Sequence, residues 1–248
     1  MIEPVEQTMA TAVTGKASSS DGDAPDATDK YGGRHRDRRA GGHGVGYEDE
    51  TAGDGPRLLG AGWGLAWLLV VSGAAGVLAS WVITLDKFRL LEDPGFTPGC
   101  SLNPVVSCGN IMKSAQASVF GFPNPMLGLV TFAVVGCVGL GLLAGARYGV
   151  WFWRGLNAGM LFGVGFCSWL QYQSLYVIGS LCLWCCLAWV ATIVMFSYVT
   201  AFNVTRGVVP APAGVRVALG EFPWVVPVLW TGIVGMLILT RWWDFWTS

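Results

Sequence analysis

The chain has 248 residues, of which 53% are hydrophobic and only 12% charged, and its formal net charge is −1. An ordinary soluble domain has roughly a quarter charged residues, so this composition indicates a membrane protein. A near-neutral charge without a basic stripe argues against a nucleic-acid partner. Both histidines, His35 and His43, lie in a polar N-terminal segment, which leaves the apolar part without an imidazole for a haem or a His-containing metal site.

The first 57 residues differ sharply from the rest. They are rich in Gly, Ser, Asp and Ala and hold 7 of the 15 Lys and Arg residues and 11 of the 16 Asp and Glu residues. Such a segment buries too little apolar surface to offset the entropy lost on ordering. We therefore predict a disordered tail at residues 1–57 and a membrane domain at residues 58–248.

Five apolar stretches follow the tail. A bilayer core of about 30 Å requires about 20 apolar residues in a helix, and five stretches reach or approach that length. They are residues 58–85, 125–144, 150–170, 181–202 and 224–239. We expect an all-α membrane protein with five spans. The irregular stretch 86–124, between the first two spans, is where a soluble partner can reach the protein.

The Lys and Arg residues near the span ends divide seven to four between the two sides, which places the N-terminal tail in the cytoplasm and the C-terminus outside. Independently of that count, the first and third links lie on one face if all five helices cross the membrane. Cys100 and Cys108 lie in the first link, and Cys182 opens the span after the third. The sequence thus predicts two cysteine pairs at one membrane surface, the oxidising outer one.

Cys182 and Cys185 form a C-x-x-C motif at the predicted start of a helix. The spacing puts both thiols on one helical face, and the helix N-terminus stabilises a thiolate. The alternative interpretation is packing, because free cysteine is among the most buried residue types. Cys186 lies on the same face, so the spacing leaves a Cys182–Cys186 pair open. Cys137 and Cys167 have no partner at a useful spacing and are predicted to be small core residues.

Cys100 and Cys108 form a second pair, separated by seven loop residues that include the turn-forming Asn103. Taken alone, this pair is also typical of a static disulfide in an exported loop. Two pairs on one face indicate instead a relay, in which thiol–disulfide exchange passes an electron pair from one pair to the next.

These motifs resemble those of the vitamin K epoxide reductase family in its bacterial form, over roughly residues 60–200. The resemblance rests on the spacing of the loop pair, on Ser114 six positions after Cys108, on the sequence Phe122-Pro123-Asn124-Pro125 before the second span, and on the Cys182–Cys185 motif. It implies a four-helix bundle around a quinone site, a fifth transmembrane helix beside it and a short outer half-helix near residues 104–118.

The resemblance also implies an order of electron transfer. Cys100 would receive electrons from a separate thioredoxin-like partner outside the cytoplasm, and Cys108 would pass them to Cys182. Cys185 would then face the ring of a membrane quinone, either menaquinone or ubiquinone. This reaction would oxidise the partner's dithiol and so support disulfide formation in exported proteins.

Three further residues are implied at the quinone site. Ser114 is similar to the serine that lines the pocket of the family. Asn124 resembles the amide that hydrogen-bonds a quinone carbonyl, although Asn is also a leading helix N-cap residue. Trp189 stands where a tyrosine can sit in relatives and offers only an N–H donor. No metal site is predicted.

Two other functions are also compatible with the sequence. A membrane protein that delivers reductant outward would use the same cysteines in the opposite direction. A non-enzymatic membrane scaffold or channel would use Cys100 and Cys108 as a structural disulfide and Cys182 and Cys185 as packing residues.

Overall fold

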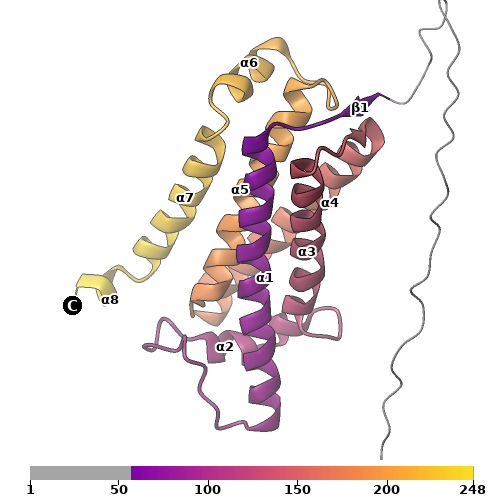
Figure 1. Cartoon of the computed structure of the whole chain (residues 1–248). Helices are drawn as coiled ribbons and strands as arrows, with labels where there is room; N and C mark the ends of the chain where they lie inside the picture. Colours follow the sequence, from indigo (N-terminus) through magenta and orange to yellow (C-terminus); the bar gives the residue numbers. More distant parts are fainter. Residues whose placement is uncertain (1–56, 248) are drawn as a thin grey trace, which may run out of the picture. The chain divides into compact units, whose positions relative to one another are not determined.

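A computed structural model describes residues 57–247, which form a helical bundle with two very short strands (Figure 1). The disordered tail predicted for residues 1–57 falls, apart from Arg57, outside the described residues. In chain order the elements are β1 (Leu58–Leu59), α1 (Trp63–Glu92), α2 (Cys108–Lys113), the 3-10 helix η1 (Ala115–Ser118), α3 (Asn124–Leu143), β2 (Tyr148–Gly149), α4 (Val150–Tyr172), the π-helical segment η2 (Gln173–Ile178), α5 (Leu183–Thr205), α6 (Ala213–Glu221), α7 (Val225–Arg241) and α8 (Trp243–Thr247).

Four long helices make the body of the bundle. α1 packs along both α3 and α5, and α4 packs along α5. α7 lies on the outer side of α5 and slants away from the body (Figure 1). The predicted all-α membrane class is confirmed, and the five long helices stand at the five predicted positions.

The contact between α1 and α3 depends on glycine. A Cβ atom added to Gly76 would lie 2.3 Å from the Phe132 ring, and one added to Gly73 would lie 2.9 Å from the Cα atom of Gly136. Small residues at these positions let the two backbones approach closely, as in many membrane helix pairs.

Length and composition qualify three helices of the described region as membrane spans, namely α1, α3 and α5. α6 and α7 are bent by 77° at their break and add a fourth span if the pair acts as one. α4 has the same length as α5 but is more polar, with Arg154, Asn157 and Gln171. The five-span topology therefore stays a prediction.

Two predicted boundaries were wrong at the end of the bundle that carries α2. α1 continues to Glu92, so residues 86–92 are helical and not irregular. Side-chain contacts stabilise these polar turns: Asp86 lies 3.8 Å from Arg89, and the Lys87 ammonium donates to the carbonyl of Met112. α2 begins at Cys108, later than the predicted start of the half-helix near residue 104.

The two ends of the bundle differ. α2 lies across one end, close to the lower parts of α1 and α5 in Figure 1, whereas β1 and α6 lie at the opposite end. The sequence did not predict α6, which begins directly after Pro212. The α2 end holds the predicted site residues.

Candidate redox site

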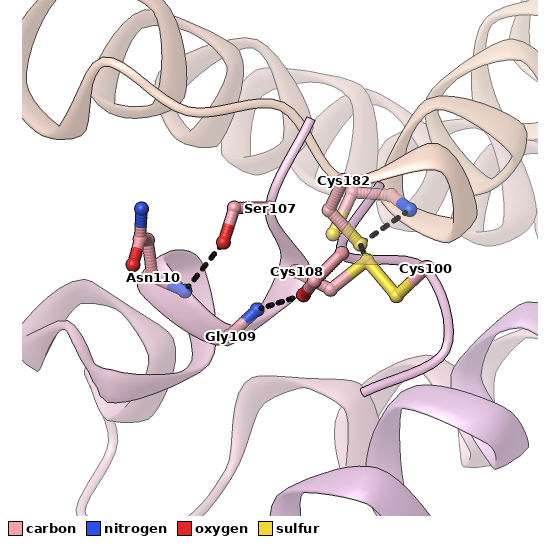
Figure 2. The surroundings of a disulfide bond; sticks show 8 residues. Cys100, Ser107, Cys108, Gly109, Asn110 and Cys182 are labelled. Atoms are coloured by element: carbon pink, nitrogen blue, oxygen red, sulfur yellow. Dashed lines mark hydrogen bonds between the residues drawn. A yellow bond between two sulfur atoms is a disulfide. The ribbon is translucent and has the colours of Figure 1, made fainter. Parts of the chain in front are cut away.

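Three cysteine sulfurs lie within 4.8 Å of one another at the α2 end. Cys100 and Cys108 are joined in a disulfide, and the Sγ atom of Cys182 lies 3.2 Å from that of Cys108 (Figure 2). Cys182 and Cys185 are free thiols. The structure thus brings the two predicted pairs into contact. Because two of the three clustered sulfurs are bonded to each other, the cluster offers a metal ion a single thiolate in this state.

Backbone pairing sets the position of the loop. Val106 and Leu181 form a parallel β-bridge. The N–H group of Leu181 donates to the carbonyl of Val105 at 2.8 Å, and that of Ser107 donates to the carbonyl of Leu181 at 2.9 Å. The bridge precedes Cys108 on one strand and Cys182 on the other, so it fixes the register of the two sulfurs.

Side chains on both sides of the β-bridge also stabilise the position of the loop. The Asn103 Oδ1 atom accepts hydrogen bonds from the N–H groups of Val105 at 3.0 Å and Val106 at 2.6 Å, which is the turn expected from the sequence. On the other side, the Asn110 amide donates to the Ser180 hydroxyl at 3.1 Å. The loop and the start of α5 are therefore tied at several points besides the sulfur contact.

Cys182 is the N-cap of α5, and its Sγ atom accepts a hydrogen bond from the N–H group of Cys185 at 3.4 Å. An N–H donor and the start of a helix both favour the thiolate form of a cysteine, and Cys182 is the sulfur of this motif that contacts Cys108.

The three clustered cysteines differ in how far they are exposed to solvent. Cys108 and Cys182 are almost fully buried, at 0% and 1% exposure, whereas Cys100 is 8% exposed. Cys100 is also preceded by the exposed Gly99, and Leu102, two residues further on, is 68% exposed. A thiol from outside the chain reaches Cys100 more readily than the other two.

Beside the sulfurs lies a cavity of about 600 Å³. This volume is within the range of small-molecule sites, about 300–1,000 Å³. α1, α3, α4 and α5 all line it, whereas none of α7 does, which matches a four-helix bundle with a fifth helix outside. Most of the lining is apolar, for example Leu127, Phe132, Met160, Phe166 and Ala188.

The three predicted cofactor-binding residues, Ser114, Asn124 and Trp189, all line this cavity together with Cys185, the residue expected to face the quinone. Cys182 lines it as well. The cavity therefore joins the C-x-x-C motif to apolar walls with a few polar groups. The walls suit a flat apolar ring with an apolar tail, and the thiols supply a two-electron donor. This donor set fits a quinone.

Asn124 does not cap α3. The N-cap is Pro123, without a side-chain hydrogen bond. The buried Asn124 amide instead donates from Nδ2 to the carbonyl of Gln116 at 2.7 Å and accepts at Oδ1 from the N–H group of Val119 at 3.1 Å. It braces the connection between α2 and α3. The second Nδ2 hydrogen stays available to a ligand in the cavity.

The remaining cysteines differ in their positions relative to the cavity. Cys186 is not among the described residues that line the cavity, and it packs against the cluster of Val105, Leu181 and Trp189. Cys185 is therefore the member of the adjacent pair that opens on the cavity. The prediction that Cys137 is a core residue was wrong, since it is exposed on α3. Cys167 lines the cavity.

A bundle with a disulfide, a contacting dithiol and an adjoining apolar cavity, built from helices able to cross a membrane, defines a membrane thiol–disulfide oxidoreductase. The sequence model of the vitamin K epoxide reductase family matches residues 67–200, more than half of the chain. The chain belongs to this family. The match includes both cysteine pairs and ends before α6. No curated protein matches the chain.

Proposed function

We propose that this protein oxidises the dithiol of a thioredoxin-like partner outside the cytoplasm and reduces a membrane quinone, and so supports disulfide formation in exported proteins. One observation carries the proposal. The Cys182 sulfur contacts Cys108 on one side, while Cys182 and Cys185 line an apolar cavity on the other. A single motif thus connects an external disulfide to a place for an apolar electron acceptor.

The first exchange takes place at Cys100. A thiolate of the partner attacks the Cys100 sulfur, the Cys100–Cys108 bond breaks, and Cys108 leaves as a thiolate. The partner's second thiol then attacks the mixed disulfide, which leaves the partner oxidised and both loop cysteines reduced. The greater exposure of Cys100 supports its role as the attacked sulfur.

The second exchange passes the electron pair inward. The Cys108 thiolate attacks Cys182 in a Cys182–Cys185 disulfide, and Cys185 leaves as a thiolate. Cys100 then attacks Cys108 and restores the loop disulfide. A closed Cys100–Cys108 bond beside free Cys182 and Cys185, as in the structure, corresponds to the state after this exchange.

The quinone, when bound, accepts two electrons and two protons. Ser114, Asn124 and Trp189 would hold its polar edge, and the apolar walls fit the ring and isoprenoid tail of either menaquinone or ubiquinone. Asn124 has a free amide hydrogen for a carbonyl oxygen. Within the described residues the Trp189 indole N–H has no hydrogen-bond partner, so it too is available as a donor.

The proposed location is the cell membrane, with the cysteine end outside and the tail of residues 1–57 in the cytoplasm. The division of Lys and Arg residues between the two sides supports this orientation. So does the disulfide, because such bonds persist in oxidising compartments.

The direct test is quinone reduction by the purified protein, followed by absorbance with a reduced thioredoxin-like protein as electron donor. Cys185→Ala should abolish the reduction, whereas the neighbouring control Cys186→Ala should retain it. Activity retained by Cys185→Ala would remove that residue from the mechanism. In cells, loss of the protein should leave exported substrates reduced; accumulation of oxidised substrates would favour the delivery of reductant outward.

A further inference from the structure

Lys87 carries a positive charge into the wall of the cavity. It lies near the end of α1, it is half-buried, and among the described residues that line the cavity it is the one with a formal charge. Placing a charge in such a wall costs free energy, so an ionisable side chain inside a membrane protein points to a function.

The ammonium lies at the sulfur end of the cavity. Ile83 and Leu90, one turn before and after Lys87 on the same face of α1, belong to the cluster that buries Cys108 and Cys182. Lys87 donates to the carbonyl of Met112, which belongs to the same cluster and also lines the cavity.

No carboxylate within the described residues neutralises Lys87. Asp86, its neighbour on α1, pairs with Arg89 at 3.8 Å. Lys113 on α2 donates to the carbonyl of Pro94. An ammonium has three hydrogens, and the Met112 carbonyl takes one, so two hydrogens and the full positive charge remain available.

We propose that the Lys87 ammonium stabilises the negative charge that develops on the oxygen of the electron acceptor in the cavity. This inference rests on the proposed quinone reduction. In that step the Cys182–Cys185 bond forms, two electrons pass to the quinone, and the two thiol protons balance the two protons of the hydroquinone. Lys87 keeps its own proton and acts through its charge and its hydrogen bond, as a preorganised electrostatic group.

The test compares the binding of two small quinones, followed by quenching of tryptophan fluorescence in the full-length protein. 1,4-Naphthoquinone is neutral, whereas 2-hydroxy-1,4-naphthoquinone is an anion at neutral pH and resembles the charged, partly reduced ring. Lys87→Met should lower the affinity for the anion about tenfold, the loss expected of one charge-assisted hydrogen bond, and leave that for the neutral quinone unchanged. Lys87→Arg should restore anion binding.

Lys113→Met is the matched control, because Lys113 also donates to a backbone carbonyl at this end but does not line the cavity. It should bind both probes as the unchanged protein does. Lys87→Gln keeps an N–H donor for Met112, so it separates loss of charge from any displacement of α2. It should behave like Lys87→Met.

Turnover gives a second readout. Lys87→Met should lower kcat with little change in KM for the quinone, and Lys87→Arg should recover most of the rate. Unchanged anion binding in both neutral variants, or an equal loss in Lys113→Met, would overturn the role of Lys87. Failure of the unchanged protein to reduce any quinone would instead overturn the proposed function, and the binding experiment distinguishes the two failures.

Discussion

Val106 and Leu181 are paired in a parallel β-bridge, two residues before Cys108 and one residue before Cys182. Backbone hydrogen bonds therefore bring the two sulfurs to 3.2 Å, and no covalent bond between the loop and α5 is needed. This arrangement allows the disulfide to change partners while the loop keeps its position.

Removal of the bridge hydrogen bond should slow exchange between the pairs. Leu181→Pro eliminates the N–H group that donates to Val105. We expect the transfer from Cys108 to Cys182, followed by rapid acid quenching and thiol labelling, to slow about tenfold, because loss of one hydrogen bond and its packing costs about 1.4 kcal/mol. Leu183→Pro is the control, because residue 183 opens α5 and a helix tolerates proline at its first position. An unaltered rate in Leu181→Pro would show that the bridge does not set the geometry.

The Asn103 Oδ1 atom accepts two hydrogen bonds in the loop turn, in addition to the backbone hydrogen bonds that the Val106 carbonyl accepts. Asn103→Ala removes this acceptor and should lower the same exchange rate severalfold by loosening the residues before Cys108. Asn103→Asp retains an oxygen at the position and should stay near the original rate. Equal rates in the two variants would contradict a role for the turn.

Asn124 should contribute to stability as well as to the cavity. Asn124→Ala leaves the Gln116 carbonyl and the Val119 N–H group without their partner, which we expect to lower the free energy of unfolding by about 1–3 kcal/mol. Denaturation in detergent measures the change. Thr240→Ala is a suitable control because its exposed hydroxyl bonds only within α7, so its change should stay within about 0.5 kcal/mol. If Asn124→Ala and Thr240→Ala had the same free energy of unfolding, Asn124 would not stabilise the connection between α2 and α3.

A second prediction on stability concerns the α1–α3 contact. Gly76→Ala places a Cβ atom against the Phe132 ring and should destabilise the protein by about 1–3 kcal/mol. Gly165→Ala is the matched change in open space on α4, and it should be neutral or slightly stabilising because alanine favours the helix. If Gly76→Ala left the free energy of unfolding unchanged, α1 and α3 would be able to move apart at little cost in free energy.

The sequence predicted the long helices because apolar runs of bilayer length have few alternative structures. It placed the cysteine pairs correctly at one end through the parity of the links, and the spacing of Cys182 and Cys185 through helical periodicity. The polar turns at the end of α1 were missed because their stability comes from Asp86–Arg89 and from the contact of Lys87 with Met112, which joins residues 25 positions apart.

Other features also depended on tertiary contacts. The choice between Cys185 and Cys186 was open in the sequence, since both lie on one helical face, and the structure distinguishes them by the position of the cavity. Asn124 had a capping pattern, but Pro123 occupies the N-cap position of α3 and the Asn124 amide bonds the η1 segment instead. Lys87 belongs to none of the motifs found in the sequence. A charged residue at the end of an apolar run was the available signal, and its place in the cavity wall required the fold.

In the proposed relay, Cys108 and Cys182 exchange a bond directly. In the double variant Cys100→Ala with Cys185→Ala, neither of these sulfurs has its usual partner, and mild oxidation should join Cys108 to Cys182. Mass spectrometry of the digested protein should then find the peptides of the two residues linked in nearly all molecules. A free Cys108, or its capture by Cys186, would contradict the relay.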